Sequence, residues 1–461
     1  MNNRIKYSIN FLLLLFAVMA FTACNKKLDV APQNTLTPDQ IKSADDVKAV
    51  LFGGYFTLQN ANALGEKYSV FSELLINNDD INWEGTFATY RDLNQDKQVT
   101  TAPEIYQVWA NSYHTINTAN IVLNKLDVLT GTEKTEIEGE AKFLRGMVYY
   151  YLVNLYALPY SAGNTTSNPG VPLVLQPVSG YDPERDKLPR ASVEAIYTQI
   201  VNDLKDAAAK MPASNPNFRA NKYSALAFLS RVYLSQAKYA EAATAANDVI
   251  ENGGFALTAA FDAAFNNTTN SSEDIFAIQQ TSQSNSGTSD FGITTFYSGT
   301  PVGRGEIQIS PSHIAKYETG DSRKDFFYDG SSISGSDGKL TRKWEELYKA
   351  IPVVRLAEMY LTRAEANYRK GGTPMGPNTP LADLNVIRKR ANLAPLAAIA
   401  TADVIVKERY LELAFEGERF FTIKRLKLNA NGHPYDFPKL ILPIPQREID
   451  LGNSLPQNPG Y

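Results

Sequence analysis

Long stretches with a single apolar face constrain the fold of this chain more than any other feature. In EGEAKFLRGMVYYYLVNLYALPY, residues 138–160, apolar side chains recur every three or four residues, which is the period of a helix with one buried face. These positions are Phe143, Leu144, Met147, Val148, Tyr151, Leu152 and Leu155. The pattern predicts one long helix that ends at Leu158 and Pro159, because proline cannot continue a helix.

Further helical stretches pair into hairpins. Residues 221–251 divide into two helices around 236–238, and small alanines in both halves allow close approach. A comparable pair covers 353–372 and 381–391. Three more helices are predicted, at 104–126, 193–211 and 404–427. Because the pattern resembles a degenerate form of the roughly 34-residue tetratricopeptide repeat, we predict an all-α fold: an irregular solenoid of tetratricopeptide-like helical hairpins with long ligand-binding loops.

A polar region interrupts these helices. Residues 266–306 are rich in Ser, Thr, Asn and Gly, and a loop of this length in a compact protein is usually functional or disordered. Disordered tracts lack aromatic residues, whereas this region contains Phe291, Phe296 and Tyr297. We therefore predict that these three rings form a ligand-contacting patch. The alternative is that they pack in the core.

The run NNDDINWEG, residues 77–85, begins the other candidate ligand site. Sugars and peptides are held by flat aromatic rings together with amide, carboxylate and guanidinium groups. The sequence supplies both kinds of group in Asn78, Asp80, Trp83, Tyr90 and Arg91. The alternative is that Trp83 packs in the core beneath a loop.

Composition and motifs argue against several classes of function. The net charge is −4 with scattered lysines and arginines, so no concentrated positive field is available to bind nucleic acid. The single cysteine forms no internal disulfide, and the three histidines lie too far apart for a Cys/His zinc cluster. The sequence has no motif of a zinc protease, a serine hydrolase or a phosphate-binding loop, and GTPVGRGE at 299–306 indicates an ordinary turn. We expect no catalytic residue, metal site or cofactor.

The first residues have the pattern of a secretory leader. Two basic residues precede an unbroken apolar run at 11–21, which spans only about 16 Å as a helix, against about 30 Å for a hydrocarbon core. Small residues followed by Cys24 resemble the bacterial lipoprotein box. We therefore predict a signal peptide at 1–23, acylation of Cys24 and a tether at 24–40. The alternative is a free thiol in an ordinary signal peptide.

A set of ordered segments carries a resemblance to a known family. EAKFLRGMVYYYLVNLYALPY resembles its early helix, and RASVEAIYTQIVNDLKDA and ALAFLSRVYLSQAKYAEAATAANDVIENGGFAL are similar to its central repeat. Its C-terminal module resembles IPVVRLAEMYLTRAEANYRKGG, LADLNVIRKRANL, VKERYLELAFEGERFFTIKRLK and LPIPQREIDLGNSLPQNPGY. The family is that of the SusD/RagB nutrient-binding outer-membrane lipoproteins of Bacteroidetes.

The resemblance implies both an architecture and a function. It implies a helical domain over 41–461, with helical repeats at 41–260, a loop-rich insert at 261–350 and a C-terminal module at 351–461. It further implies a lipid-anchored protein of the outer membrane, at the cell surface. Such a protein captures an oligosaccharide, or a peptide as in the RagB branch, and passes it to a SusC-like TonB-dependent transporter.

Charged residues at helical spacings near the C-terminus indicate structure rather than chemistry. Arginine forks pair with carboxylates between packed helices. We predict such stabilising ion pairs for Arg355, Glu358, Glu365, Arg388, Arg390, Glu408, Arg409, Glu416 and Arg419.

Two functions of other classes remain open from the sequence. A glycoside hydrolase needs only two carboxylates about 5 to 9.5 Å apart, and the chain has 49 acidic residues. A protein-binding scaffold is the other alternative, because tetratricopeptide arrays commonly serve that purpose.

Overall fold

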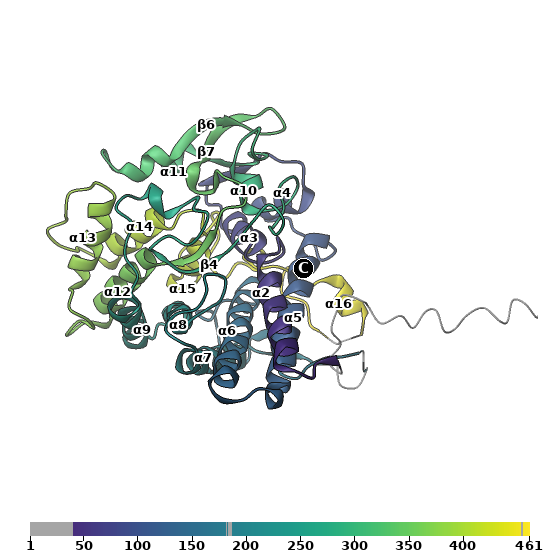
Figure 1. The fold of residues 1–461 in the computed structure, drawn as a ribbon. Coiled ribbons are helices and arrows are strands. Elements are labelled where there is room, and N and C mark those ends of the chain that lie inside the picture. Colours follow the sequence, from purple (N-terminus) through teal and green to yellow (C-terminus); the bar gives the residue numbers. More distant parts are fainter. Residues whose placement is uncertain (1–39, 181, 183–186, 453–454) are drawn as a thin grey trace, which may run out of the picture. The chain divides into compact units, whose positions relative to one another are not determined.

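The computed structural model describes residues 40–180, 182, 187–452 and 455–461. The predicted signal peptide, Cys24 and nearly all of the tether lie outside these residues. Within the described residues, fifteen α-helices, α2 to α16, predominate over three small sheets. The prediction of a helical fold is therefore confirmed (Figure 1).

Seven helices pack successively into one row, each against the next in sequence order. They are α5 (Pro103–Asn124), α6 (Gly131–Tyr156), α7 (Val193–Lys210), α8 (Lys222–Ser235), α9 (Tyr239–Asn252), α12 (Leu356–Lys370) and α13 (Pro380–Arg390). The predicted hairpins correspond to α8 with α9 and to α12 with α13. Figure 1 shows α6, α7, α8, α9 and α12 as neighbours.

Local sequence sets where several of these helices begin. Asn221 caps α8, since its Oδ1 accepts the N–H groups of Tyr223 and Ser224 at 2.9 and 3.1 Å. The Thr379 hydroxyl caps α13 in the same way, and Pro380 occupies the first helical turn, where its missing N–H costs nothing. The starts of α8 and α13 were therefore predictable to within a residue or so.

The chain between α9 and α12 leaves the row of helices. β4 (Asp274–Ile278) pairs antiparallel with β8 (Ile351–Arg355), so the segment between them starts and ends side by side. We call this segment, residues 279–350, the insertion. It contains α10 (Ile293–Tyr297), β5 (Ile307–Ile309), α11 (Pro311–Ile314), β6 (Phe327–Ser331) and β7 (Asp337–Thr341). The sequence predicted loops here, and the structure adds strands and short helices.

The insertion forms a four-stranded sheet together with a strand from far away in the sequence. β1 (Ile81–Trp83) pairs with β5 in the order β1-β5-β7-β6, and Trp83 lies opposite Ile307. This pairing brings the two predicted ligand patches together. A separate pair, β2 (Pro169–Pro172) with β3 (Arg190–Ser192), lies beside α7.

Six further helices complete the fold. They are α2 (Ala44–Gln59), α3 (Lys67–Leu75), α4 (Ala88–Asn94), α14 (Ala402–Glu412), α15 (Glu418–Leu426) and α16 (Gln446–Asp450). α2 packs on α5 and α6, and α15 packs on α3. The C-terminal helices therefore contact the N-terminal ones.

The prediction of one helix over 404–427 is wrong, because the chain breaks between α14 and α15. Gly417 has a φ of +78°, which a residue with a side chain rarely adopts. Its N–H donates to Glu73 Oε1 at 2.7 Å, and a Cβ at this position would lie 2.9 Å from the Cα atom of Ser69. The break thus lets the backbone approach α3 closely.

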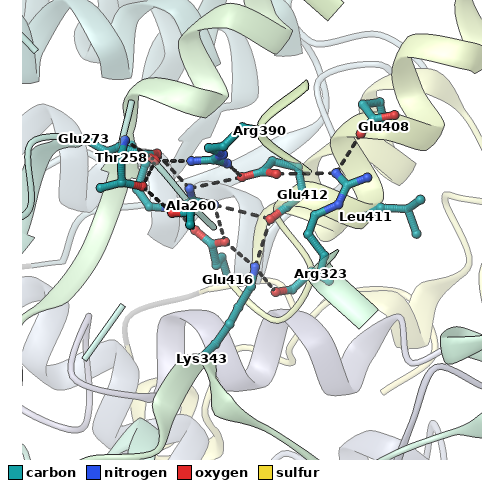
Figure 2. A network of polar contacts seen from close by, with 12 residues as sticks. Thr258, Ala260, Glu273, Arg323, Lys343, Arg390, Glu408, Leu411, Glu412 and Glu416 are labelled. Atoms are coloured by element: carbon teal, nitrogen blue, oxygen red, sulfur yellow. Dashed lines mark hydrogen bonds and ion pairs between the residues drawn. The ribbon is translucent and has the colours of Figure 1, made fainter. Parts of the chain in front are cut away.

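A buried network of charges joins these elements. Arg355 is fully buried and contacts the carboxylates of Glu273, Glu412 and Glu416 at 3.1, 3.2 and 2.7 Å. Arg390 also contacts Glu273 and Glu412, and Figure 2 shows Glu412 between Arg390 and Arg323. The network connects Glu273, directly before β4, with β8, α13 and α14, which confirms the predicted ion pairing of Arg355, Arg390 and Glu416.

Candidate functional site

The two predicted aromatic patches meet in one stack of rings. Trp83 of β1 stacks on Tyr90 of α4, with ring centroids 4.9 Å apart. Phe296 of α10 lies 5.5 Å from Trp83 and 5.0 Å from Tyr90. Phe87 covers the edge of this group, 5.8 Å from Tyr90. The sequence therefore identified residues that do come together.

These rings are buried, which corrects the expectation that they form an exposed platform. Trp83 is 8% exposed, Tyr90 1%, and Phe296 and Tyr297 are 0% exposed. Trp83 and Tyr90 stack face to face, Phe296 packs against both, and Tyr297 lies against Phe415, so these buried rings offer no face to a solute in this arrangement. The alternative interpretation, in which Trp83 packs in the core beneath a loop, describes the structure.

The buried pair of Glu66 and Lys67 contacts the ring cluster and the loop at residues 291 and 292. The Tyr90 hydroxyl donates to Glu66 Oε1, and the Gly292 N–H donates to Glu66 Oε2 at 2.6 Å. Burial raises the pKa of the Glu66 carboxyl above its ordinary value, although Lys67 at 3.7 Å opposes the shift. The Lys67 ammonium lies 4.9 Å from the centre of the Phe291 ring, in a cation–π contact. Phe291 is thereby held from beneath.

Phe291 is the one predicted aromatic residue that faces solvent, with 45% of its surface exposed. The adjacent Asp290 pairs with Arg304 at 3.2 Å. Arg304 also donates to Glu306 at 2.8 and 2.9 Å, and its guanidinium lies 5.0 Å from the half-buried Phe87 ring. We call Phe87, Asp290, Phe291 and Arg304 the Phe291 surface. It offers one partly exposed aromatic ring beside a charged hydrogen-bonding pair.

The polar residues predicted around Trp83 have mainly structural contacts. Asp80 is 4% exposed and pairs with Lys316 and Arg419. It also lies 3.3 Å from Nδ1 of His313, where burial lowers the histidine pKa to about 3, so the ring is neutral. Asp80 therefore anchors α11 and α15 rather than a solute.

Asn78 and Arg91 have different environments. The Asn78 N–H donates to Asn431 Oδ1 at 2.9 Å, and the Asn431 N–H donates back to Asn78 Oδ1 at 3.0 Å. This reciprocal pair fixes the turn before β1. Arg91 is exposed and lies 3.3 Å from Asp92, so its guanidinium is accessible to solutes. The structure does not bring Arg91 into contact with Phe291.

Sequence reasoning missed Arg304 and Phe87. Arg304 lies within GTPVGRGE, whose glycines indicate only a turn. Its ring partner Phe87 is far away in sequence, so no local pattern joins the two residues. The aromatic Phe87 lies in the same run as Trp83 and Tyr90, and that clustering was an available signal.

Two further observations limit the chemistry of the described residues. Among them, no group of three or more His, Cys, Asp or Glu side chains is arranged to hold a metal ion. No helix in the described ranges combines the length and the apolar character needed to cross a membrane.

Comparison of the sequence with known families gives two matches. Residues 26–234 match a SusD-like family described as "Starch-binding associating with outer membrane". Residues 337–437 match the SusD family, also designated SusD_RagB. The stretch between the two matches contains most of the insertion.

Individual relatives agree with these matches. The chain is 26% identical over 543 aligned residues to "SusD-like protein P2" of Formosa agariphila, covering 99% of this chain and all of the relative. It is 33% identical over 153 residues to the "Starch-binding protein SusD" of Bacteroides thetaiotaomicron, covering 29% of this chain and 27% of the relative.

Solved structures share the fold. A SusD superfamily protein of Bacteroides thetaiotaomicron superposes with a TM-score of 0.80 at 24% identity, over 90% of this chain and all of that chain. The "Surface glycan-binding protein A" of Bacteroides fluxus gives 0.75 at 24% identity, over 90% of this chain and 99% of that one. The solenoid of helical hairpins is thus the SusD fold, and the chain belongs to the SusD/RagB family.

Proposed function

We propose that the protein is a cell-surface lipoprotein that binds oligosaccharides or polysaccharide and delivers them to a TonB-dependent outer-membrane transporter. The observation that carries the binding proposal is the exposed Phe291 ring beside the Asp290–Arg304 pair, in a chain of this family. A flat apolar ring takes the apolar face of a sugar, and the charged pair takes its hydroxyl groups. Relatives whose names refer to starch or glycan binding support the choice of ligand.

The contacts of the acidic groups near Phe291 favour binding without catalysis. Glu306 is fully buried and engaged by Arg304, Asp290 is paired with the same guanidinium, and Glu66 holds Tyr90 and Gly292. A hydrolase needs one carboxylic acid and one free carboxylate on either side of the scissile bond. Carboxylates that already have partners are poorly suited to that role.

Replacement of Phe291 by alanine is expected to weaken glycan binding about tenfold, because the variant loses the stacking ring at the centre of the surface. Isothermal titration calorimetry against a panel of neutral and acidic oligosaccharides measures the affinity. Phe291→Tyr, which keeps the ring, is expected to retain most of it.

Three results of that experiment would contradict parts of the proposal. Failure of the wild-type protein to bind any glycan, with a co-purified peptide found by mass spectrometry, would favour peptide capture. Release of reducing sugar from a bound glycan would identify a hydrolase. Equal glycan affinities of Phe291→Ala and the wild type would show that the ligand does not bind at the Phe291 surface.

The lipid anchor is tested separately from the ligand. We expect Cys24→Ser to abolish incorporation of radiolabelled palmitate and to move the protein from the membrane fraction to the soluble fraction. The change removes the only thiol that could carry the acyl chain. Circular dichroism of the soluble product serves as the control for folding. Membrane attachment that survives the substitution would refute the anchor.

A further inference from the structure

Three of the four exposed phenylalanines in the described residues line a single groove. Phe52 is 37% exposed, Phe56 62% and Phe218 43%. Phe52 and Phe56 lie one turn apart on α2, and Phe218 lies in the loop before α8, 5.6 Å from Phe52 in an edge-to-face contact. They line a groove of about 260 Å³, which we call the α2 groove; its other lining residues are Tyr55, Gln59, Ala277, Ile278, Gln279, Thr281 and Ser284.

The core does not need these rings. The α2 helix packs on α5 and α6, and its buried residues are Val47, Leu51, Gly54, Tyr55, Leu58 and Gln59. Phe52 and Phe56 are not among them. Leaving a phenylalanine in water instead of burying it forgoes about 1.5–3 kcal/mol. A cluster of exposed aromatic rings on a protein surface therefore indicates a binding site.

Hydrogen-bonded polar groups also line the groove, beside the apolar Ala277 and Ile278. Gln59 Nε2 donates to the carbonyl of Gln279 at 2.6 Å and to that of Ser284 at 3.1 Å. The Ser284 hydroxyl donates back to Gln59 Oε1 at 2.8 Å. Thr281 Oγ1 accepts the N–H groups of Gln283 and Ser284, so the hydrogen of its exposed hydroxyl remains available to donate.

The groove carries no charge of its own. Among the described residues that line it, none is Lys, Arg, Asp or Glu. Arg219, whose guanidinium lies 5.6 Å from the Phe52 ring, is already paired with Glu140. A charged ligand would lose its hydration here without gaining an ionic partner.

From these contacts we infer that the α2 groove is a second carbohydrate-binding site, specific for neutral oligosaccharide. The three rings take the apolar faces of successive sugars, and the Thr281 hydroxyl donates to a sugar oxygen. A wholly apolar occupant would cover the Thr281 hydroxyl without offering it an acceptor, at a cost of about 1–3 kcal/mol. A sugar has both an apolar face for the rings and an oxygen that can accept from Thr281.

One segment of chain borders both sites. Ser284 contacts Gln59 beside the α2 groove, and eight residues later the Gly292 N–H contacts Glu66 beneath Phe291. The inference rests on the proposed function, since it assigns a second contact for the same class of ligand. Two linked contacts bind a polymer more tightly than either contact alone, because the second binding event becomes intramolecular.

The test compares two sets of variants in the full mature chain. The groove variant carries Phe52→Ser, Phe56→Ser and Phe218→Ser, all at exposed positions, and Phe291→Ala is the matched variant at the other site. The probes are maltoheptaose, cellohexaose, xylohexaose and mannohexaose, with hexamannuronate as the charged control. Hydrogen exchange with and without each probe locates the contact on peptides that contain α2 or Phe291.

We expect Phe291→Ala to retain binding of a neutral probe, with exchange protection over α2. Addition of the groove substitutions should lower that residual affinity at least about tenfold. Binding that is unchanged in the groove variant, or protection confined to Phe291, overturns the second site and leaves the proposed function intact. Binding of no neutral probe by the wild type overturns both. Loss of affinity for vesicles of phosphatidylethanolamine and phosphatidylglycerol, with unchanged glycan binding, would instead identify a membrane contact.

Discussion

Replacement of Trp83 by alanine is expected to lower the free energy of unfolding by about 3–5 kcal/mol, the usual cost of removing a large buried aromatic side chain. The ring is 8% exposed and contacts Tyr90 and Phe296, so its removal leaves a cavity at the junction of β1, α4 and α10. Urea unfolding followed by circular dichroism measures the change.

The matched control for Trp83 is Phe56→Ala, which removes an aromatic ring that is 62% exposed. Substitution at a surface position of this kind is expected to change stability by about 0.5 kcal/mol or less. If Trp83→Ala prevents folding altogether, Trp83→Phe keeps most of the contacts and allows a measurement. A small loss of stability together with a large loss of glycan affinity would return Trp83 to the ligand surface.

Arg355→Met is expected to cost about 3–5 kcal/mol at neutral pH, because it removes the one cation among the described residues that contacts all three buried carboxylates. Arg355 is fully buried and contacts Glu273, Glu412 and Glu416 (Figure 2 shows the three carboxylates). Methionine fills similar space, so the loss reports charge rather than volume. Urea unfolding at two pH values separates this effect from ordinary packing.

The sign of the pH dependence follows from Glu412. Burial alone would raise its pKa, but Arg390, Arg355 and Arg323 outweigh burial and hold the pKa at about 2, below the ordinary value of 4.5. This contribution to stability is present above pH 4.5 and is lost as the pH falls toward 2. Without Arg355 the carboxylates protonate more readily, so the deficit of the variant should shrink on acidification from pH 7.

The control for Arg355 is an exposed ion pair. Arg342 lies 2.6 Å from Glu345, and the two side chains are 44% and 34% exposed. Arg342→Ala is expected to change stability by less than about 1 kcal/mol, because water screens the pair. If Arg355→Met lowers the free energy of unfolding by the same amount at both pH values, the side chain stabilises the protein by packing rather than by charge.

Helices were predictable because their signals are local. The apolar period of α6 and the turn at 236–238 between α8 and α9 depend only on neighbouring residues. The break at Gly417 depends on α3, which lies more than 300 residues earlier, so the continuous apolar period across 404–427 concealed it. Local sequence patterns therefore predicted most of the helices but not the contact between the C-terminal segment at Gly417 and α3.

The candidate site was predictable in composition but not in exposure. Trp83 and Phe296 were identified as aromatic residues near polar ones, and they do meet. Trp83 and Phe296 are buried where β1 pairs with β5. This pairing is a long-range contact, and neither segment has a sequence pattern that predicts it. Phe52 and Phe56 carried a local signal, since they lie off the apolar stripe of α2, and that signal was missed.

The closure of the insertion by β4 and β8 has an evolutionary consequence. Because these strands hold residues 279–350 at both ends, that segment can lengthen, shorten or change sequence while the seven-helix row keeps its own contacts. Selection for a new ligand can then act on the exposed parts of the insertion, provided that buried residues such as Arg323 and Phe296 keep their contacts with Glu412 and Trp83. Chimaeras that exchange this segment between homologues should fold, and should inherit the ligand preference of the donor.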